Sequence, residues 1–349
     1  MARANVVVMS HAPDLIDLRS DTVTKPTDEM RKAMAEAEVG DDRYGEDPTV
    51  RRLEELYAEL VGKQAALYLP SGTMANQVAL RSWTSPGSVV LAGKNQHLVQ
   101  FERAGAAKNS NIQFGLIRET DGELRADDLS EELQLQIHFG LEVSLVCIEN
   151  THMPSGGRPW KIDHLEELKA AIGAIPLHMD GARLFNASAA TGIKPSEYAS
   201  LVDSVMSCVS KGLSAPIGSI LAGSEDFIAR ARTERQILGG QMRQAGVIAA
   251  AGIVALETMV DRLVEDHRRA KLLATAVADR YPECGLDPAA VETNIVVFEH
   301  KDPTGFLNYL RGNDILAGTI SPGKVRLVTH KDLDDSSVDL ALKAISHAP

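Results

Sequence analysis

Two kinds of hydrophobic pattern alternate along the first two thirds of the chain. From Pro48 onward, leucines and a valine recur at near-helical spacing as far as Val61, which predicts a helix. The short apolar run Ala65–Leu69 then predicts a strand, and a second helical pattern follows it after Ser71. Before these elements, residues 27–38 have helical character and lead into the polar loop 40–48. The order helix, strand, helix is typical of an α/β fold.

The same alternation continues beyond residue 85. Extended patterns occupy residues 88–92, 112–117 and 142–149, and helical patterns occupy residues 100–107, 126–135 and 162–172. Such alternation predicts a mostly parallel sheet covered by helices on both faces. The strand ends near Glu149, Asp180 and Ser210 should then lie along one edge, where ligands bind in sheets of this kind.

A change of pattern near residue 260 predicts a second, smaller domain. Residues 244–259 form a long helical pattern rich in small residues, and a charged helical pattern spans residues 261–280. Four shorter patterns then read strand, helix, strand, helix, at residues 294–300, 304–310, 325–329 and 336–345. We therefore expect a disordered tail at residues 1–13, a large domain at 14–260 that includes the N-terminal segment, and a small α+β domain at 261–349.

Composition narrows the class of protein. The 349 residues are 44% hydrophobic and 24% charged, as in ordinary globular proteins of two packed units. A net charge of −12 argues against a broad surface for nucleic acid. The three widely spaced cysteines indicate neither a disulfide framework nor a zinc site, and no apolar run approaches the roughly 20 residues of a membrane span. We expect a cytoplasmic protein that binds neither nucleic acid nor membrane.

A single lysine, Lys211, lies among small residues in the segment 207–219. A bulky ligand could approach its amine closely there, as a lysine that forms a Schiff base requires. A surface lysine in a turn between strands would give the same pattern, so the segment alone leaves both interpretations open.

Asp180 ends the predicted strand upstream of that lysine. A carboxylate held against the ring nitrogen of pyridoxal phosphate (PLP) keeps this nitrogen protonated, and together with a Schiff-base lysine it meets the protein-side requirements of that cofactor. Ser71, Gly72 and Thr73 supply small and hydroxyl residues at a strand-to-helix turn, where free N–H groups can bind a phosphate. A simpler interpretation of Asp180 and Lys211 is a buried ion pair. A simpler interpretation of residues 71–73 is an ordinary capped helix.

Taken in order, the motifs resemble those of the threonine aldolases, a β-eliminating lyase group within the fold-type I PLP-dependent enzymes. The resemblance covers nearly the whole chain. It rests on the segments Asp17–Thr24, Gly40–Thr49, Ser71–Thr73, Glu149–His152, Asp180–Arg183, Ser210–Leu213, Gly239–Gln244 and Val325–His330. It implies a fold-type I architecture, with a mostly parallel sheet between helices in the large domain and a small C-terminal α+β domain.

The resemblance also implies a cofactor site. Lys211 would hold PLP as a Schiff base, Asp180 would face the ring nitrogen, and His97 matches the histidine that stacks on the ring. The phosphate and the remaining cofactor contacts would fall to Ser71, Gly72, Thr73, Arg183, Ser210 and, from a neighbouring subunit, Arg243. A borrowed arginine implies a homo-oligomer, a dimer or a tetramer, whose active sites are shared.

For the substrate, the resemblance assigns His152 a place near the β-hydroxyl group. Its ordinary pKa of about 6.5 would let it accept a proton near neutrality, directly or through water. Arg183, Arg326 and Ser20 match the groups that bind the substrate carboxylate, which suits guanidinium groups because they pair with it bidentately. Tyr44 resembles a residue that lines the site, possibly across a subunit boundary.

The predicted reaction is the retro-aldol cleavage of L-threonine, L-allo-threonine or a related β-hydroxy-α-amino acid such as phenylserine to glycine and an aldehyde. Residues 153–160 and Ser214 depart from the commonest family pattern, which leaves the preference at Cβ open. A racemase or β-eliminating lyase on the same frame is the main alternative. A non-catalytic PLP-binding protein is disfavoured by the presence of Lys211, Asp180 and His152 together, and a dinucleotide-binding protein by the lack of a Gly-x-Gly-x-x-Gly motif after the strand.

Overall fold

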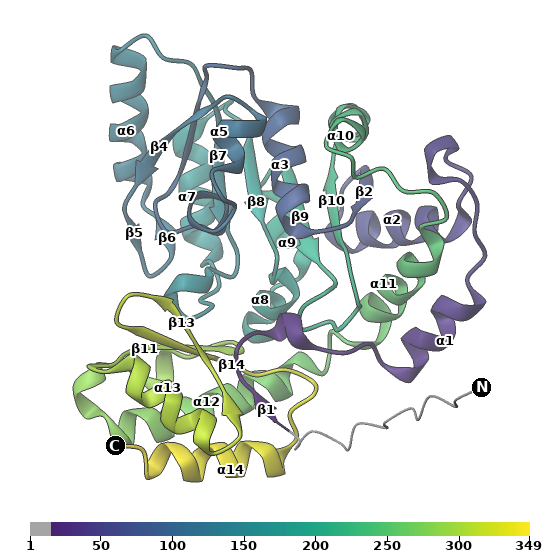
Figure 1. The fold of residues 1–349 in the computed structure, drawn as a ribbon. Helices are drawn as coiled ribbons and strands as arrows, with labels where there is room; N and C mark the ends of the chain where they lie inside the picture. The colour runs from purple at the N-terminus through teal and green to yellow at the C-terminus, as the bar shows by residue number, and fades with distance from the viewer. Residues whose placement is uncertain (1–14) are drawn as a thin grey trace, which may run out of the picture.

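The computed structural model describes residues 15–349 and has two units (Figure 1). The tail predicted for residues 1–13 lies outside the described residues. In Figure 1 the larger unit lies above, and the smaller unit, coloured green to yellow, lies below it. The domain boundary near residue 260 stays a prediction, although the long helix α12 (Leu263–Arg280) begins close to it.

A seven-stranded sheet forms the centre of the larger unit, in the order β2-β10-β9-β8-β7-β3-β4. Its strands are β2 (Ala65–Leu69), β3 (Val89–Gly93), β4 (Gln113–Ile117), β7 (Val143–Glu149), β8 (Leu177–Asp180), β9 (Ser204–Cys208) and β10 (Ser219–Gly223). Strand β10 is antiparallel to both of its neighbours, and every other pairing is parallel. The prediction of a mostly parallel sheet is therefore confirmed.

Helices cover both faces of this sheet, because side chains alternate between two cores along each strand. Leu91 of β3 faces one core, and its neighbour Val90 faces the other. The first core is covered by α1 (Asp28–Glu36), α2 (Pro48–Val61), α6 (Ala126–His138), α7 (Ile162–Ile172), α8 (Leu184–Thr191), α9 (Pro195–Ser200) and α11 (Gly246–Thr258). The opposite face is covered by α3 (Gly72–Trp83), α4 (His97–Gln100), α5 (Gly105–Asn109) and α10 (Glu225–Ile237).

One predicted helix is wrong. Residues 100–107 do not form a continuous helix, because Arg103 and Ala104 adopt left-handed backbone angles, with φ of 56° and 59°. A left-handed residue ends an α-helix, so the chain forms the two short helices α4 and α5 instead. The two left-handed residues themselves gave no signal, since neither is glycine or asparagine, and the glycine at position 105 comes one residue after them.

The smaller unit packs helices α12, α13 (Pro303–Gly312) and α14 (Asp335–Ser346) with a three-stranded antiparallel sheet. Its strands are β11 (Ile295–Glu299), β14 (Lys324–Val328) and β13 (Gly318–Ser321), in that order. The predicted sequence of strand, helix, strand and helix is present. Strand β13 was not predicted because its residues are half-buried or exposed and lack an apolar run.

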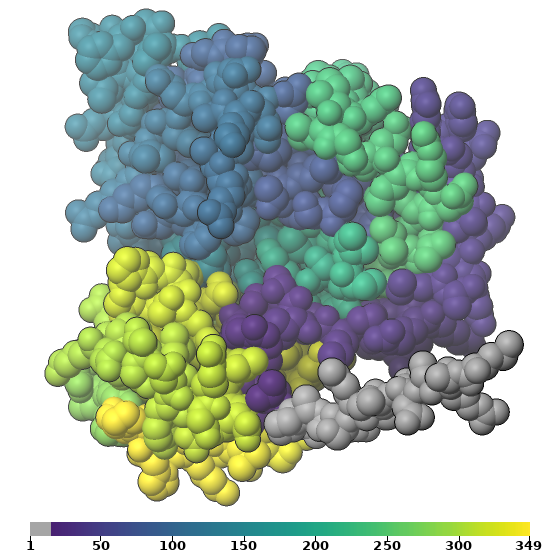
Figure 2. All heavy atoms as spheres, in the orientation of Figure 1, coloured from purple at the N-terminus to yellow at the C-terminus, as the bar shows by residue number. Residues whose placement is uncertain are grey.

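The start of the N-terminal segment packs on the smaller unit, although the prediction placed the whole segment with the large domain. Strand β1 (Ile16–Asp17) pairs in parallel with β12 (Ile315–Leu316), and Ile16 and Leu18 lie in the hydrophobic core of the smaller unit. A strand of two residues has too few positions for a pattern, so periodicity could not place it. Figure 2 shows this purple segment on the surface where the yellow and teal regions meet.

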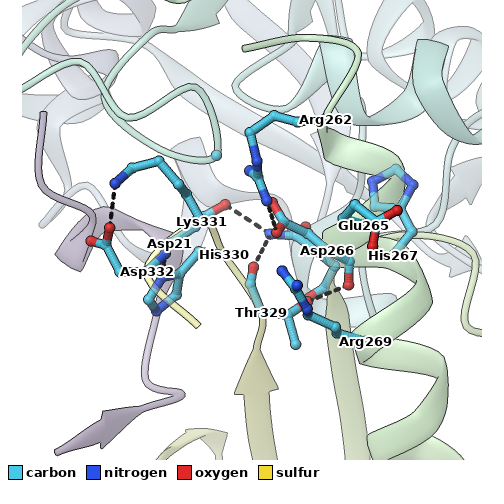
Figure 3. A network of polar contacts seen from close by, with 12 residues as sticks. Asp21, Arg262, Glu265, Asp266, His267, Arg269, Thr329, His330, Lys331 and Asp332 are labelled. Carbon is cyan, nitrogen blue, oxygen red and sulfur yellow. Dashed lines mark hydrogen bonds and ion pairs between the residues drawn. The ribbon is translucent and has the colours of Figure 1, made fainter. Parts of the chain in front are cut away.

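A network of polar contacts joins the end of β14 to α12 and to the N-terminal segment (Figure 3). Thr329 Oγ1 donates a hydrogen bond of 2.6 Å to the main-chain oxygen of Asp266, whose buried carboxylate pairs with Arg262. His330 Nε2 lies 2.7 Å from the main-chain oxygen of Asp17. These contacts fix the position of β14 relative to the N-terminal segment.

Another tertiary contact sits at the start of α2, where Asp47 is buried. Its Oδ1 accepts hydrogen bonds from the N–H groups of Thr49 and Val50, as a helix N-cap does, and its Oδ2 accepts one of 2.8 Å from the N–H of Gly246. Asp47 therefore joins the first turns of α2 and α11.

We expect Asp47→Ala to lower the free energy of unfolding by about 2–3 kcal/mol, since it removes a helix cap and leaves the buried N–H of Gly246 without an acceptor. The exposed N-cap Asp334 of α14 is a matched control, and Asp334→Ala should cost clearly less, since it removes a helix cap but no tertiary hydrogen bond. Urea denaturation followed by circular dichroism measures both losses. Equal losses in the two variants would contradict the tertiary role of Asp47.

Candidate active site

A cavity of about 300 Å³ opens where strands β8 and β9 end beside the first turn of α3. This volume is at the lower end of the range for small-molecule sites. Seven of the predicted site residues line the cavity: Ser71, Gly72, Thr73, His97, Asp180, Ser210 and Lys211. The prediction that the strand ends at Glu149 and Asp180 lie side by side with the end of β9 is confirmed, since Glu149 pairs with Asp180, and Asp180 pairs with Met206.

Lys211 lies in the loop between β9 and β10, and main-chain contacts hold this loop in place. Its carbonyl oxygen accepts hydrogen bonds from the N–H of Ser214 at 2.8 Å and from Thr24 Oγ1 at 3.0 Å. Ser214, noted above as a departure from the family pattern, has a φ of 66°, a conformation that glycine adopts more readily. Within residues 15–349 the amine of Lys211 makes no ion pair, so it is available to a ligand in the cavity.

Asp180 is buried at the end of β8 with both carboxylate oxygens in use. Oδ1 accepts a hydrogen bond of 3.1 Å from the N–H of Ala182, and Oδ2 accepts one of 2.7 Å from Asn76 Nδ2. These two donors fix the carboxylate at the cavity wall, where it can accept a hydrogen bond from a protonated ring nitrogen.

The first turn of α3 approaches β9 so closely that only glycine fits at position 72. A Cβ atom on Gly72 would lie 2.8 Å from Cys208 Sγ. Ser71 caps the helix, because its Oγ accepts a hydrogen bond of 3.2 Å from the N–H of Met74. The remaining N–H groups of this turn and the hydroxyl of Thr73 point to an anion site at the positive end of the helix. The cavity therefore offers what PLP needs, a lysine, a carboxylate and a phosphate cradle.

His97 begins α4 and is held from two sides. Its main-chain N–H donates a hydrogen bond of 2.7 Å to Glu149, and its Nδ1 lies 3.1 Å from Glu102 Oε1. Burial alone would lower the pKa of His97, but the hydrogen bond to Glu102 and the charge of Asp180 outweigh it, so the pKa is raised. The imidazole ring stacks on Phe101, with ring centroids 5.5 Å apart.

His152 lies outside this cavity and lines a neighbouring cavity of about 610 Å³ between the two units. The ring is buried, and its Nε2 is 3.1 Å from Glu119 Oε1. Burial would lower the pKa of His152, but the nearby carboxylates of Glu119 and Glu149 outweigh it, so the pKa is raised. Asn95 holds Glu119 in turn, with hydrogen bonds of 3.0 Å from its N–H and 2.7 Å from Nδ2 to Oε2.

The two arginines assigned to the substrate carboxylate differ in their surroundings. Arg183 donates to the buried Asp21 through Nε and Nη2, at 2.8 and 2.6 Å, so this carboxylate already engages one edge of its guanidinium group. Arg326 contacts only a main-chain oxygen and a sulfur, at Arg19 and Met153, and it makes no ion pair within residues 15–349. Burial and the charge of Arg183 lower the pKa of Arg326. A partly buried guanidinium group without a carboxylate is suited to bind an anion.

Ser20 and the two residues expected near a subunit boundary lie apart from the cavity. Ser20 Oγ accepts a hydrogen bond of 3.3 Å from the N–H of Thr22, which lines the cavity. Tyr44 is 71% exposed, and the side chain of Arg243 is 59% exposed, with its nearest carboxylate, that of Asp41, at 3.9 Å. A single chain does not bring Tyr44 or Arg243 to the cavity.

A sequence model of the beta-eliminating lyases matches residues 17–301. The chain belongs to the beta-eliminating lyase family. It is 40% identical to low-specificity L-threonine aldolase 1 of Arabidopsis thaliana, over 95% of this chain and 96% of that protein. It is 41% identical to the low specificity L-threonine aldolase of Escherichia coli K12, over 91% of this chain and 95% of that protein.

Solved structures show the same fold as this lyase. A threonine aldolase from Leishmania major superposes with a TM-score of 0.80 at 19% identity and covers 95% of this chain and 98% of its own. A putative L-allo-threonine aldolase from Listeria monocytogenes has a TM-score of 0.77 at 22% identity, with 96% of each chain covered. The predicted resemblance, the fold-type I architecture, the lyase class and PLP as the cofactor are thereby confirmed. The roles of individual residues stay predictions.

Sequence reasoning missed four polar residues that support the site of this lyase: Asp21, Asn76, Glu102 and Glu119. Asn76 gave a weak signal, since it is a polar residue among the apolar positions of α3. Glu102 and Glu119 gave none, because their spacing from His97 and His152 follows no helical or strand period. Asp21 lies within a quoted motif, but its partner is 162 residues away.

The ion pair between His152 and Glu119 predicts a pH dependence of stability. The folded pKa of His152 is raised above its unfolded value of about 6.5, so the pair stabilises the fold fully below that pH and this contribution is lost as pH rises through the folded pKa. The free energy of unfolding of the wild type should therefore exceed that of Glu119→Gln most below pH 6, and the difference should shrink toward pH 9. Urea denaturation across this range measures it.

A double variant provides the control for this pH dependence. In a His152→Gln background, Glu119→Gln should leave a difference that does not vary with pH. If the wild type and Glu119→Gln keep a constant difference from pH 5 to 9, the ring of His152 does not titrate against Glu119.

Proposed function

We propose that this chain is a PLP-dependent aldolase that cleaves L-threonine, L-allo-threonine or related β-hydroxy-α-amino acids to glycine and an aldehyde. The observation that carries the proposal is the meeting of Lys211, Asp180 and the first turn of α3 in one cavity. The relatives named low-specificity L-threonine aldolases, about 40% identical over nearly the full length, support the choice of substrate class.

The residues of the cavity divide the binding of PLP among them. Lys211 would form the Schiff base, Asp180 would face the ring nitrogen, and His97 would lie against the ring. The phosphate would sit on the first turn of α3, with Ser210 nearby. When bound, PLP supplies an electron sink for the breaking of a bond at the substrate Cα.

Arg326 would bind the substrate carboxylate, since it is partly buried close to Arg183 and, unlike Arg183, has no carboxylate partner in the described part of the chain. Arg183 and Ser20, which lie near Asp21, would also contact the substrate carboxylate. A carboxylate fixed in this way restricts rotation about the bond between the substrate nitrogen and Cα, so that the Cα–Cβ bond is the one placed for cleavage. Orientation of this kind accounts for a large share of enzymatic rate enhancement.

His152 would take the proton of the β-hydroxyl group, directly or through one water molecule. Nε2 is the ring nitrogen close to Glu119, at 3.1 Å from Oε1, and neither ring nitrogen makes a hydrogen bond among residues 15–349. A neutral ring with its hydrogen on Nε2 would keep the lone pair of Nδ1 for the substrate proton. Glu119 also keeps the positive charge of the ring stable after the proton has moved. The raised pKa of His152 makes the ring a stronger base than a free histidine.

The chain would act as a homo-oligomer in which Tyr44 and Arg243 serve the neighbouring subunit. Both side chains are exposed, and their loops are adjacent, because the N–H of Asp42 donates a hydrogen bond of 3.1 Å to the carbonyl oxygen of Arg243. Between residues 15 and 349, none of the helices is long and apolar enough to span a membrane. A cytoplasmic location stays a prediction.

The first test is aldehyde release by the PLP-loaded protein from each of the four stereoisomers of threonine. We expect cleavage of the L or L-allo forms, and loss of turnover by more than about 10³-fold in Lys211→Ala. Lys169→Ala is the control, since Lys169 pairs with Asp203 just before β9 starts, at the far end of the strand from Lys211. Release of pyruvate or racemisation of alanine, without aldehyde, would favour the alternative reactions instead.

A second test concerns the shared site. We expect Arg243→Ala to weaken PLP binding, and Lys211→Ala to be inactive. When the two variants are co-expressed in equal amounts, about half of the interfaces should pair one variant with the other. Each such hybrid interface has one complete site of two, so activity should recover to about a quarter of the wild-type value. An arginine that serves its own subunit would give no recovery above the sum of the two variants.

A further inference from the structure

Three ionisable side chains crowd together at the inner wall of the cavity. Ligating atoms of His97, Glu102 and Asp180 all lie within 4.8 Å of one another, and the side chain of Glu102 is fully buried. Two buried carboxylates this close repel each other unless hydrogen-bond donors separate them. The structure must therefore supply those donors.

Asn76 supplies them to both carboxylates at once. Its Nδ2 donates a hydrogen bond of 2.7 Å to Asp180 Oδ2 and one of 2.8 Å to Glu102 Oε1, so its two hydrogens are both used. Both carboxylates are also among the three groups that could hold a metal ion. Because the amide already fills the space between them, the arrangement is a hydrogen-bond bridge.

A chain of hydrogen bonds continues behind Asn76. Because both hydrogens of Asn76 are engaged by the two carboxylates, its Oδ1 must accept, and the neutral ring of His178 supplies the hydrogen. His178 Nδ1 is then the acceptor for the Ser204 hydroxyl at 2.9 Å, and Ser204 Oγ accepts from the Trp83 indole at 2.8 Å. His178 then carries its hydrogen on Nε2, which lies 3.2 Å from Asn76 Oδ1. Burial lowers the pKa of His178 to about 4, which keeps the ring neutral, as this chain of donors requires.

Glu102 is fixed from its other side as well. Its Oε2 accepts a hydrogen bond of 2.7 Å from Gln77 Nε2, and Gln77 Oε1 accepts one of 3.0 Å from Asn109 Nδ2. Its Oε1 also lies 3.1 Å from His97 Nδ1. A carboxylate can only accept here, so Nδ1 of His97 carries a hydrogen, and Nε2 is the nitrogen left for other contacts.

We propose that Glu102 is the residue that positions the cofactor ring from both sides, since it sets the tautomer and tilt of His97 directly and the carboxylate of Asp180 through Asn76. This inference rests on the proposed placement of PLP against Asp180 and His97. Glu102 itself does not line the cavity, so it acts through these two side chains.

Glu102→Gln should disturb the arrangement although it keeps the size of the side chain. The new amide group has one acceptor oxygen in place of two, so its NH₂ must face the NH₂ of Asn76 or that of Gln77. Asp180 and His97 would both lose their fixed orientation. The cofactor should bind more weakly, and its absorption should respond to pH differently.

The test is titration of the apo-protein with PLP, followed by the visible absorption of the bound cofactor from pH 6 to 9. We expect Glu102→Gln to raise the Kd for PLP at least about tenfold and to shift the pH at which the absorption band changes. Glu102→Asp should restore part of both. Glu123→Gln is the matched control, because Glu123 is another buried glutamate that accepts from a main-chain N–H, that of Lys161, and pairs with a histidine, His164, away from the cavity.

Asn76→Ala gives an independent reading, because it removes the bridge and keeps Glu102. It should raise the Kd for PLP in the same direction, and it applies even if Glu102→Gln does not fold. The inference would be overturned if both variants had a Kd for PLP within about twofold of that of the Glu123→Gln control and an absorption band that changed at the same pH as in that control.

The proposed function fails in a different way. If the wild type does not bind PLP, or if Asp180→Asn does not weaken binding, the placement of the cofactor is wrong. If the wild type binds and Asp180→Asn weakens binding, while Glu102→Gln and Asn76→Ala resemble the control, only the role of Glu102 is wrong.

Discussion

Burying a charged carboxylate at the end of a parallel sheet is the constraint on which this structure depends. Asp180 is buried, so every donor around it has to be supplied by the protein. The N–H of Ala182 and the amide of Asn76 supply them, which requires α3 to pack closely over β8 and β9. The same close packing allows only glycine at position 72 and brings the first turn of α3 to the cavity. The proposed partner of the ring nitrogen and the proposed phosphate site thus result from one packing arrangement.

The junction between the two units is built on a second buried charge pair. Asp21, in the N-terminal segment, pairs with Arg183 of the larger unit, and it also accepts a hydrogen bond of 3.1 Å from Asn294 Nδ2 in the smaller unit. One carboxylate therefore contacts three parts of the chain. Arg326, which makes no ion pair within the described residues, lies on β14 of the smaller unit, close enough to Arg183 for their charges to interact. A substrate carboxylate bound between them would add to the contacts that hold the units together.

Features set by residues close together in the sequence could be predicted, and features set by contacts between distant residues could not. Lys211, Asp180 and Gly72 are set by local patterns, a strand end or a strand-to-helix turn, and the structure brings them together as expected. The polar residues that hold the site side chains in place come from other helices and strands. No helical or strand periodicity relates Asn76 to Asp180, or Glu119 to His152. The same reason explains why the two-residue strand β1 was placed in the wrong unit.

The electrostatics of the cavity bear on whether one chain makes a complete site. Of the Lys and Arg residues that the structure describes, only Lys211 lines the cavity, and the proposed Schiff base would use its amine. A helix N-terminus contributes the equivalent of only about half a positive charge, which is too little for a phosphate that carries up to two negative charges. The side chain of Arg243 is exposed, and its nearest carboxylate lies 3.9 Å away, so its charge is only weakly paired. The exposed charge of Arg243 on a second copy of the chain would complement this cavity, as the proposed shared site requires.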